Sequence, residues 1–146
     1  MMSKRNSTTI ALTFIWIGLV CAISFMEAWL KFQAPGITLE LGLGIGKLVF
    51  NTLNKIEWAL AIIIMLSSIL SGQSLIKGKH ILLIITVVIL AMQSFWLLPT
   101  LFERANMHIE AKSVSSSSIA HYTYIIVEVI KVVSLSVFGV SLLRKR

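Results

Sequence analysis

The chain contains one cysteine, two prolines and few charged residues, and these scarcities exclude several classes of protein. A single cysteine, Cys21, allows neither a disulfide within the chain nor paired-thiol redox chemistry. Charged residues make up 13% of the sequence, with 6 acidic residues against 13 basic ones. No phosphate-binding loop, dinucleotide-binding glycine pattern or nucleophile motif occurs. This composition is not typical of a soluble enzyme domain.

Apolar residues dominate the sequence. They account for 57% of the 146 positions, and the mean hydropathy is +0.91. Four apolar stretches approach or exceed the roughly 20 residues that cross a bilayer as a helix. In lipid each segment must satisfy its own backbone polar groups, so these stretches are expected to be helical. The sequence predicts an all-α integral membrane protein of one domain, residues 1–146, with a bundle of four transmembrane helices near residues 10–30, 48–70, 81–98 and 119–143.

Basic residues are concentrated in three short segments that a four-helix topology places on one side. These are Lys4 and Arg5, Lys77 and Lys79, and residues 144–146. Cytoplasmic loops are enriched in lysine and arginine, so both termini are expected in the cytoplasm and the chain in the plasma (bacterial inner) membrane. The net charge of +7 reflects this asymmetry and an attraction to anionic lipid headgroups. The basic residues form no continuous patch, which argues against nucleic-acid binding.

The histidines give little indication of a metal or haem site. His80, His108 and His121 fall in different loops or on different sides of the predicted bundle, without the histidine–glutamate spacing of metal-binding bundles. His121 alone cannot supply two axial haem ligands. We therefore expect no metal and no other cofactor.

The segment between the first two predicted spans, residues 35–47, combines helix-breaking and small residues. Pro35 and Gly36 are expected to end the first helix. Gly42 and Gly46 have the spacing of a close helix contact. An amphipathic helix on the outer surface and a re-entrant piece packed on the bundle both fit this pattern.

Several residues of the first half of the chain recur in the second half. Seventy or seventy-one positions separate Ser24, Phe25, Phe32, Thr52 and Glu57 from Ser94, Phe95, Phe102, Thr123 and Glu128. The recurrence suggests two copies of one helical hairpin, both beginning on the cytoplasmic side. In such a parallel repeat, Glu57 and Glu128 would face each other at a similar depth.

The fourth predicted span has the clearest polar pattern. His121, Tyr124, Glu128 and Lys131 are spaced three, four and three residues apart, which places them on one helix face. Lys131 is expected near the midplane of the membrane, with Glu128 one turn closer to the outside. An ionised side chain at that depth costs roughly 2.5 to 3.5 kcal/mol, so it indicates a functional site. The alternative is a structural ion pair that holds the fourth helix to its neighbours.

The other spans also become polar toward their outer halves. Their polar positions include Ser24, Glu27 and Lys31 in the first span, Asn51, Asn54 and Glu57 in the second, and Gln93 in the third. Side chains that reach the membrane interface explain Lys31 but not the deeper Gln93. We therefore expect a ligand- or proton-binding site formed by Glu57, Glu128, Lys131, His121, Tyr124, Asn51, Asn54 and Gln93.

Three functions fit this pattern. The first is the binding or transport of a small solute or of protons, in a homo-oligomer because four helices enclose little space. The second is an accessory or assembly subunit of a larger membrane complex, whose polar stripes pair with helices of another protein. The third is an intramembrane enzyme acting on a lipid or quinone, although no nucleophile or catalytic residue is recognisable. The layout is similar to that of many small bacterial membrane proteins, including DoxX-like ones, in architecture only.

Overall fold

The computed structural model describes residues 4–72, 78, 80–109 and 119–144. Within these residues the regular secondary structure is entirely helical. Four helical rods are long and apolar enough to cross a membrane: Ser7–Gln33, Leu39–Leu70, His80–Met107 and Tyr122–Leu143. The predicted all-α architecture with four potential membrane spans is therefore confirmed.

The first rod is not a uniform α-helix. It consists of α1 (Lys4–Val20), a π-helical segment η1 (Cys21–Glu27), the short α2 (Ala28–Leu30) and a 3₁₀ turn η2 (Lys31–Gln33). Gly36 then adopts a φ of +81°, a left-handed conformation that glycine accepts without strain, and the chain reverses direction.

The second rod, α3 (Leu39–Leu70), begins earlier than the hydropathy pattern suggests. The Thr38 hydroxyl accepts a hydrogen bond from the Leu41 amide at 3.2 Å and caps the helix. Residues 39–47 are therefore the first turns of the second rod, and neither a separate surface helix nor a re-entrant piece is formed there. The cap at Thr38 explains this difference, because it allows the helix to start within the glycine-rich segment.

Gly42 and Gly46 lie where α3 contacts the end of the first rod. A Cβ atom at Gly42 would overlap the ring of Phe32, and one at Gly46 would lie 2.8 Å from Nζ of Lys31. The glycine spacing therefore makes room for a helix contact within the chain, as the sequence suggests.

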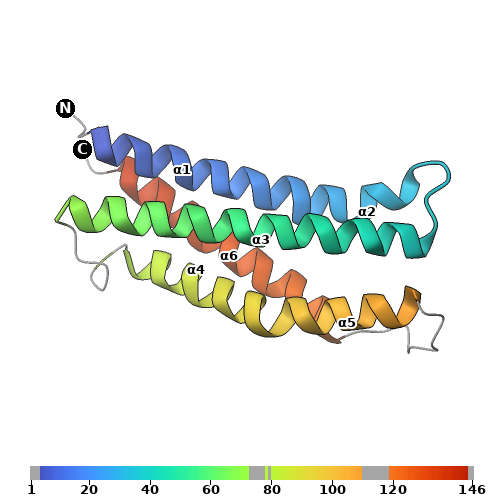
Figure 1. The fold of residues 1–146 in the computed structure, drawn as a ribbon. Helices are drawn as coiled ribbons and strands as arrows, with labels where there is room; N and C mark the ends of the chain where they lie inside the picture. Colours follow the sequence, from blue (N-terminus) through green and yellow to red (C-terminus); the bar gives the residue numbers. More distant parts are fainter. Residues whose placement is uncertain (1–3, 73–77, 79, 110–118, 145–146) are drawn as a thin grey trace.

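The third rod comprises α4 (His80–Met92), the π-helical segment η3 (Gln93–Leu97) and α5 (Leu98–Ile109). The helix continues through Pro99, beyond the expected end of the span. Pro99 has no amide hydrogen to donate to the preceding turn, which belongs to the π-helical segment η3. The rod changes direction between α4 and α5 (Figure 1), and π-helical turns and prolines are two common causes of such a bend.

The fourth rod, α6 (Ile119–Leu143), crosses the bundle obliquely and packs against α1 and α4 (Figure 1). Both termini lie at one end of the bundle, here called the terminal end. The opposite end, where α2, the start of α3 and α5 gather, is called the pocket end.

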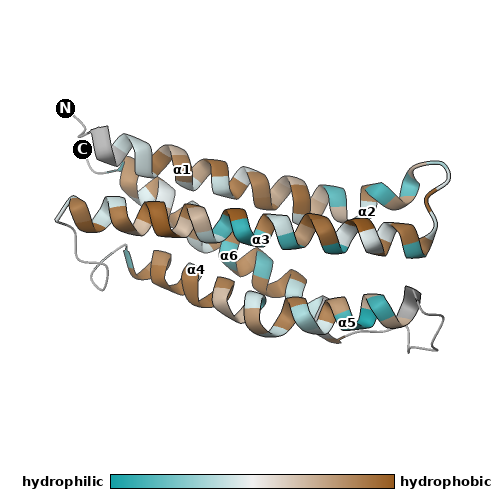
Figure 2. Ribbon diagram, viewed as in Figure 1, coloured by the Kyte–Doolittle hydropathy of each residue, from teal (hydrophilic) through white to brown (hydrophobic). Residues whose placement is uncertain are grey.

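Two apolar clusters fill the interior, one on each side of a polar layer. The first, toward the terminal end, contains Trp16, Val20, Leu60, Ala61, Ile64, Leu83, Leu90, Leu135, Phe138 and Leu142. The second, toward the pocket end, contains Leu97, Leu98 and Tyr124, with Phe50, Met92, Leu101 and Phe102 packed against them. Hydrophilic residues interrupt the otherwise apolar middle parts of α3 and α6 (Figure 2). Glu57, Gln93, Glu128 and Lys131 are buried in this polar layer.

Candidate functional site

Lys131 is the centre of the polar layer. It lies at the midpoint of α6 and its side chain is fully buried. Its Nζ atom is 2.6 Å from Oε1 of Glu57, 2.9 Å from Oε2 of Glu128 and 2.8 Å from Oε1 of Gln93. An ammonium group has three hydrogens, and here each can be donated to an acceptor from α3, α6 or η3. The charge is thus buried but fully hydrogen-bonded.

The two glutamates receive further hydrogen bonds from the first and third rods. Trp16 Nε1 donates to Oε1 of Glu57 at 2.8 Å. Ser24 Oγ donates to Oε1 of Glu128 at 2.6 Å, and the Gln93 amide donates to Oε2 of the same carboxylate. We call these six residues the charged cluster: Trp16, Ser24, Glu57, Gln93, Glu128 and Lys131.

The charged cluster is closed off from its surroundings. Glu57 is 2% exposed, Gln93 1% exposed, and Glu128 and Lys131 are fully buried. Its own side chains fill it, so no solute fits among the charged groups as they stand. The cluster also holds two carboxylates against one ammonium group. Buried charges are costly unless they are compensated, so the second carboxylate requires a further positive charge or a proton.

The two π-helical segments each contribute one donor to Glu128. Ser24 lies within η1, and Gln93 is the first residue of η3. A π-helical turn contains an extra residue and redirects the side chains around it, and such turns occur frequently at functional sites. The irregular backbone of two rods therefore coincides with the hydrogen bonds that hold one carboxylate.

Four of the predicted site residues come together in this cluster: Glu57, Glu128, Lys131 and Gln93. Tyr124 is buried one turn from Glu128, toward the pocket end. Its position next to the cluster therefore agrees with the face predicted for α6.

The remaining predicted residues lie elsewhere. Asn54 donates to the Ser94 hydroxyl at 2.8 Å, and Trp58 Nε1 donates to the same oxygen at 2.9 Å, so Asn54 belongs to a separate contact between α3 and η3. Asn51 is exposed on α3, because it falls on the outward side of that helix. His121 lies in α6, but its side chain is outside the described part of the structure.

Trp16 and Ser24 were missed as site residues. Trp16 is embedded in an apolar stretch of α1, where tryptophan is an ordinary packing residue, so no sequence signal singles it out. Ser24 carried a signal, because it recurs as Ser94 and lies on the polar side of the first span. That signal does not identify Glu128 as its partner.

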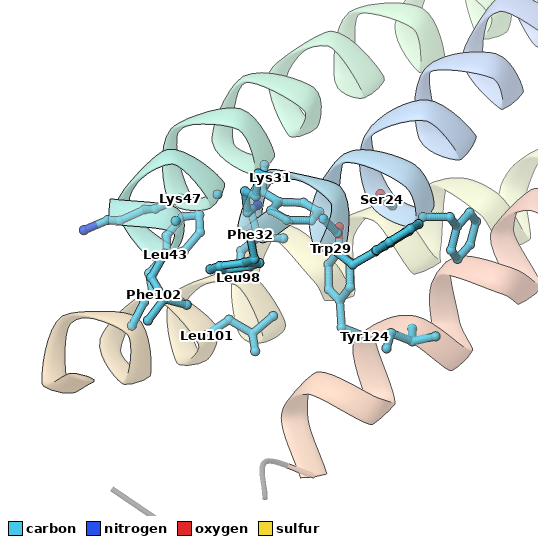
Figure 3. Close-up of a pocket in the computed structure, with 17 residues that line it drawn as sticks. Ser24, Trp29, Lys31, Phe32, Leu43, Lys47, Leu98, Leu101, Phe102 and Tyr124 are labelled. Carbon is cyan, nitrogen blue, oxygen red and sulfur yellow. The ribbon is translucent and has the colours of Figure 1, made fainter. Parts of the chain in front are cut away.

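An apolar pocket of about 360 Å³ lies between the charged cluster and the pocket end of the bundle. Its walls are mainly aromatic and aliphatic side chains of the first rod, α3, α5 and α6 (Figure 3). The polar side chains among its lining residues are those of Ser24, Lys31, Lys47 and Tyr124. A volume of this size falls at the lower end of the range for small-molecule sites.

Ser24 joins the pocket to the charged cluster. It lines the pocket, and its hydroxyl donates to Glu128. Tyr124 lines the same part of the pocket. A molecule in the pocket can therefore reach, through one hydroxyl group, a carboxylate that is otherwise sealed inside the bundle.

Among the described residues, no three histidine, cysteine, aspartate or glutamate side chains come together in an arrangement that could hold a metal ion. Comparisons of the chain with protein-family models, curated proteins and solved structures found no match. The function is therefore inferred from the geometry of the site.

Proposed function

We propose that this protein binds a small molecule in the apolar pocket and holds an exchangeable proton in the charged cluster next to it. The position of Ser24 is the main support for this proposal, since Ser24 lines the pocket and also belongs to the charged cluster. A ligand that packs against Ser24 would favour the orientation in which its hydroxyl donates to Glu128, away from the pocket. Ligand occupancy and the charge balance of the cluster would then be linked.

The number of charged groups in the cluster supports the presence of a bound proton. Lys131 compensates one of the two carboxylates, and a proton is the smallest group that can compensate the other in a filled, closed cluster. Glu128 accepts from three donors, whereas both donors to Glu57 reach the same oxygen, Oε1. The proton is therefore best placed on the other oxygen of Glu57, with Glu128 as the ionised partner of Lys131.

The geometry supports binding more directly than transport by a single chain. The filled cluster lies between the pocket and the terminal end, so a solute has no open path past it. Transport would require a rearrangement of the cluster or a second copy of the chain, and we assign any transport to a homo-oligomer. The polar faces of α3 and α6 contact each other, so they supply no argument for an accessory subunit.

We further propose that the bundle lies in a bacterial inner membrane with both termini in the cytoplasm. Lys4 and Arg144 are at the terminal end, which supports this orientation under the rule that cytoplasmic segments are basic. The pocket then faces the outer half of the membrane.

A duplicated helical hairpin is the second structural part of this proposal. It is supported by the two π-helical segments, η1 and η3, which contain the recurring pairs Ser24–Phe25 and Ser94–Phe95. The meeting of Glu57 and Glu128 at Lys131 is also what a parallel duplication would produce.

Native mass spectrometry of the gently extracted protein tests the binding function. We expect one small molecule per chain, which is lost when Ala28, a lining residue, is replaced in Ala28→Trp. The control Ala22→Trp adds the same bulk at an exposed position of the same rod outside the pocket and should retain the molecule. Wild-type protein without a stoichiometric molecule, or equal retention in both variants, would contradict the proposal.

Glu128→Gln tests the link to the cluster. If Ser24 and Glu128 couple the pocket to the buried charges, this variant should lose the bound molecule while remaining folded. A folded Glu128→Gln protein with unchanged retention would remove Glu128 from the binding site.

A further inference from the structure

The charged side chains among the described residues that line the pocket are of one sign. They are Lys31 and Lys47, and Lys31 also pairs with Glu27 outside the lining. Both lysines belong to the pocket end of the bundle, whereas Ser24 and Tyr124 lie toward the charged cluster. The pocket therefore has a cationic part and a deeper part that is largely apolar.

Each lysine is held against an aromatic wall of the pocket. Nζ of Lys31 lies 5.5 Å from the ring centroids of both Phe32 and Phe50. Nζ of Lys47 lies 5.8 Å from the ring centroid of Phe102. Cation–π contacts of this kind position an ammonium group without using its hydrogen-bond donors. Nζ of Lys31 thus lies among the lining side chains, whereas Lys47 runs along the edge of the pocket with its nitrogen directed outward (Figure 3).

Both ammonium groups retain donors for a ligand. Among the described residues, Lys31 donates to Glu27 at 3.2 Å and Lys47 donates to Asn106 at 3.1 Å. An ammonium group carries three hydrogens, so each lysine can make further hydrogen bonds. An anionic group is the partner that uses both the charge and the remaining donors.

The rest of the pocket suits hydrocarbon. Its walls include Phe25, Leu98 and Ile125, and the hydroxyl of Ser24 is already donated to Glu128. A pocket of about 360 Å³ accommodates one chain or one ring system. The two chains of a bilayer phospholipid exceed this space.

We infer that the pocket binds a free amphiphile with one hydrocarbon chain and an anionic head, such as a fatty acid. The head contacts Lys31 and Lys47, and the chain extends toward Ser24 and Tyr124. This inference rests on the proposed binding function and specifies the class of its ligand. It also explains why two lysines sit on the wall of an otherwise apolar pocket.

Photo-crosslinking tests the inference in phosphatidylcholine nanodiscs. The probes are a palmitic acid and a hexadecanol that carry the same diazirine group on the chain, so that they differ only in the head. We expect the acid to label peptides from the pocket wall about tenfold more than the alcohol, because a charge-assisted hydrogen bond contributes on that scale. Unlabelled palmitate should compete with the acid probe.

Variants of the lysines that line the pocket test where the anionic head of the ligand binds. Lys31→Gln/Lys47→Gln should reduce capture of the acid about tenfold while capture of the alcohol stays unchanged. Lys55→Gln removes an exposed lysine that does not line the pocket and should have no effect. Lys47→Gln alone provides a milder test, since the contact of Lys47 with Asn106 is exposed and its loss should leave the fold intact.

The possible outcomes distinguish failure of this inference from failure of the binding function on which it rests. Equal labelling by acid and alcohol, or capture insensitive to the lysine variants, would overturn the anionic head while leaving a small-molecule pocket. Phosphatidylglycerol in the nanodiscs that displaces the acid as effectively as palmitate would assign the site to a bilayer phospholipid and overturn the single-chain ligand. Absence of pocket labelling by either probe, with no bound molecule in native mass spectrometry, would overturn both proposals.

Discussion

Lys31 and Lys131 each pair with a glutamate on their own helical rod, but at different cost. The Lys31–Glu27 pair remains partly exposed, with side-chain exposures of 10% and 26%, so water can stabilise both charges. Lys131 and Glu128 are fully buried and depend on their protein neighbours. A buried pair contributes little net stability when intact, yet loss of one partner leaves an uncompensated charge.

Replacement of each lysine in turn should show different losses of stability for the partly exposed pair and the buried pair. We expect Lys131→Met to reduce the free energy of unfolding by about 3 to 5 kcal/mol, because the buried, ionised Glu128 loses its cation. Lys31→Met should cost about 1 kcal/mol or less. Thermal unfolding in a fixed detergent would measure both, and similar losses in the two variants would contradict the central role of Lys131.

Replacement of Glu57 and of Glu128 by glutamine should also have different effects on stability. If Glu57 carries the proton, glutamine is its close neutral equivalent, and Glu57→Gln should cost about 1 kcal/mol or less. Glu128→Gln would bring an amide group against donors from Ser24, Gln93 and Lys131, which should cost about 2 kcal/mol or more. The reverse order of stabilities, measured in the same unfolding assay, would place the proton on Glu128.

At the scale of the helices, the π-helical segments and the small residues of α3 position the site. η1 and η3 interrupt the first and third rods at the level of the charged cluster. Gly42 and Gly46 allow the end of the first rod to lie close to α3, where Phe32 and Lys31 form part of the pocket wall. The shape of the pocket therefore depends on backbone features as well as on the residues that line it.

Two glycine variants test this contact between rods. Gly42→Ala should destabilise the protein by about 1 to 3 kcal/mol, because its methyl group would displace the ring of Phe32. Gly44→Ala provides the control, since no atom lies within 4 Å of the added carbon and alanine is the better helix former. Thermal unfolding that shows Gly42→Ala as stable as Gly44→Ala would mean that this contact does not hold the two rods together.

At the scale of the whole molecule, the sequence predicts the spans and part of the site. Long apolar stretches are sufficient to locate four helices, and the deep positions of Glu57, Gln93, Glu128 and Lys131 are sufficient to predict that they face the interior. The contact of Trp16 with Glu57 could not be predicted, because it depends on how the rods cross. Asn51 shows the same limit, since a polar residue one or two turns from a buried one can still face outward.

The pocket could not be predicted for a related reason. Its walls come from four separate parts of the chain, and its connection to the cluster depends on the orientation that η1 gives to Ser24. A regular helix assumed for residues 10–30 contains no such turn. Long-range packing and backbone irregularity therefore determine the part of the site that hydropathy and spacing leave open.

Infrared spectroscopy tests the central claim most directly, namely that two buried carboxylates share one lysine and one proton. Wild-type protein in nanodiscs at neutral pH should show the carbonyl band of a protonated carboxylic acid, which exchanges slowly with deuterium because the group is buried. The band should disappear in Glu57→Gln and persist in Glu103→Gln, which changes an exposed residue. A wild-type spectrum that contains only ionised carboxylates would contradict the account.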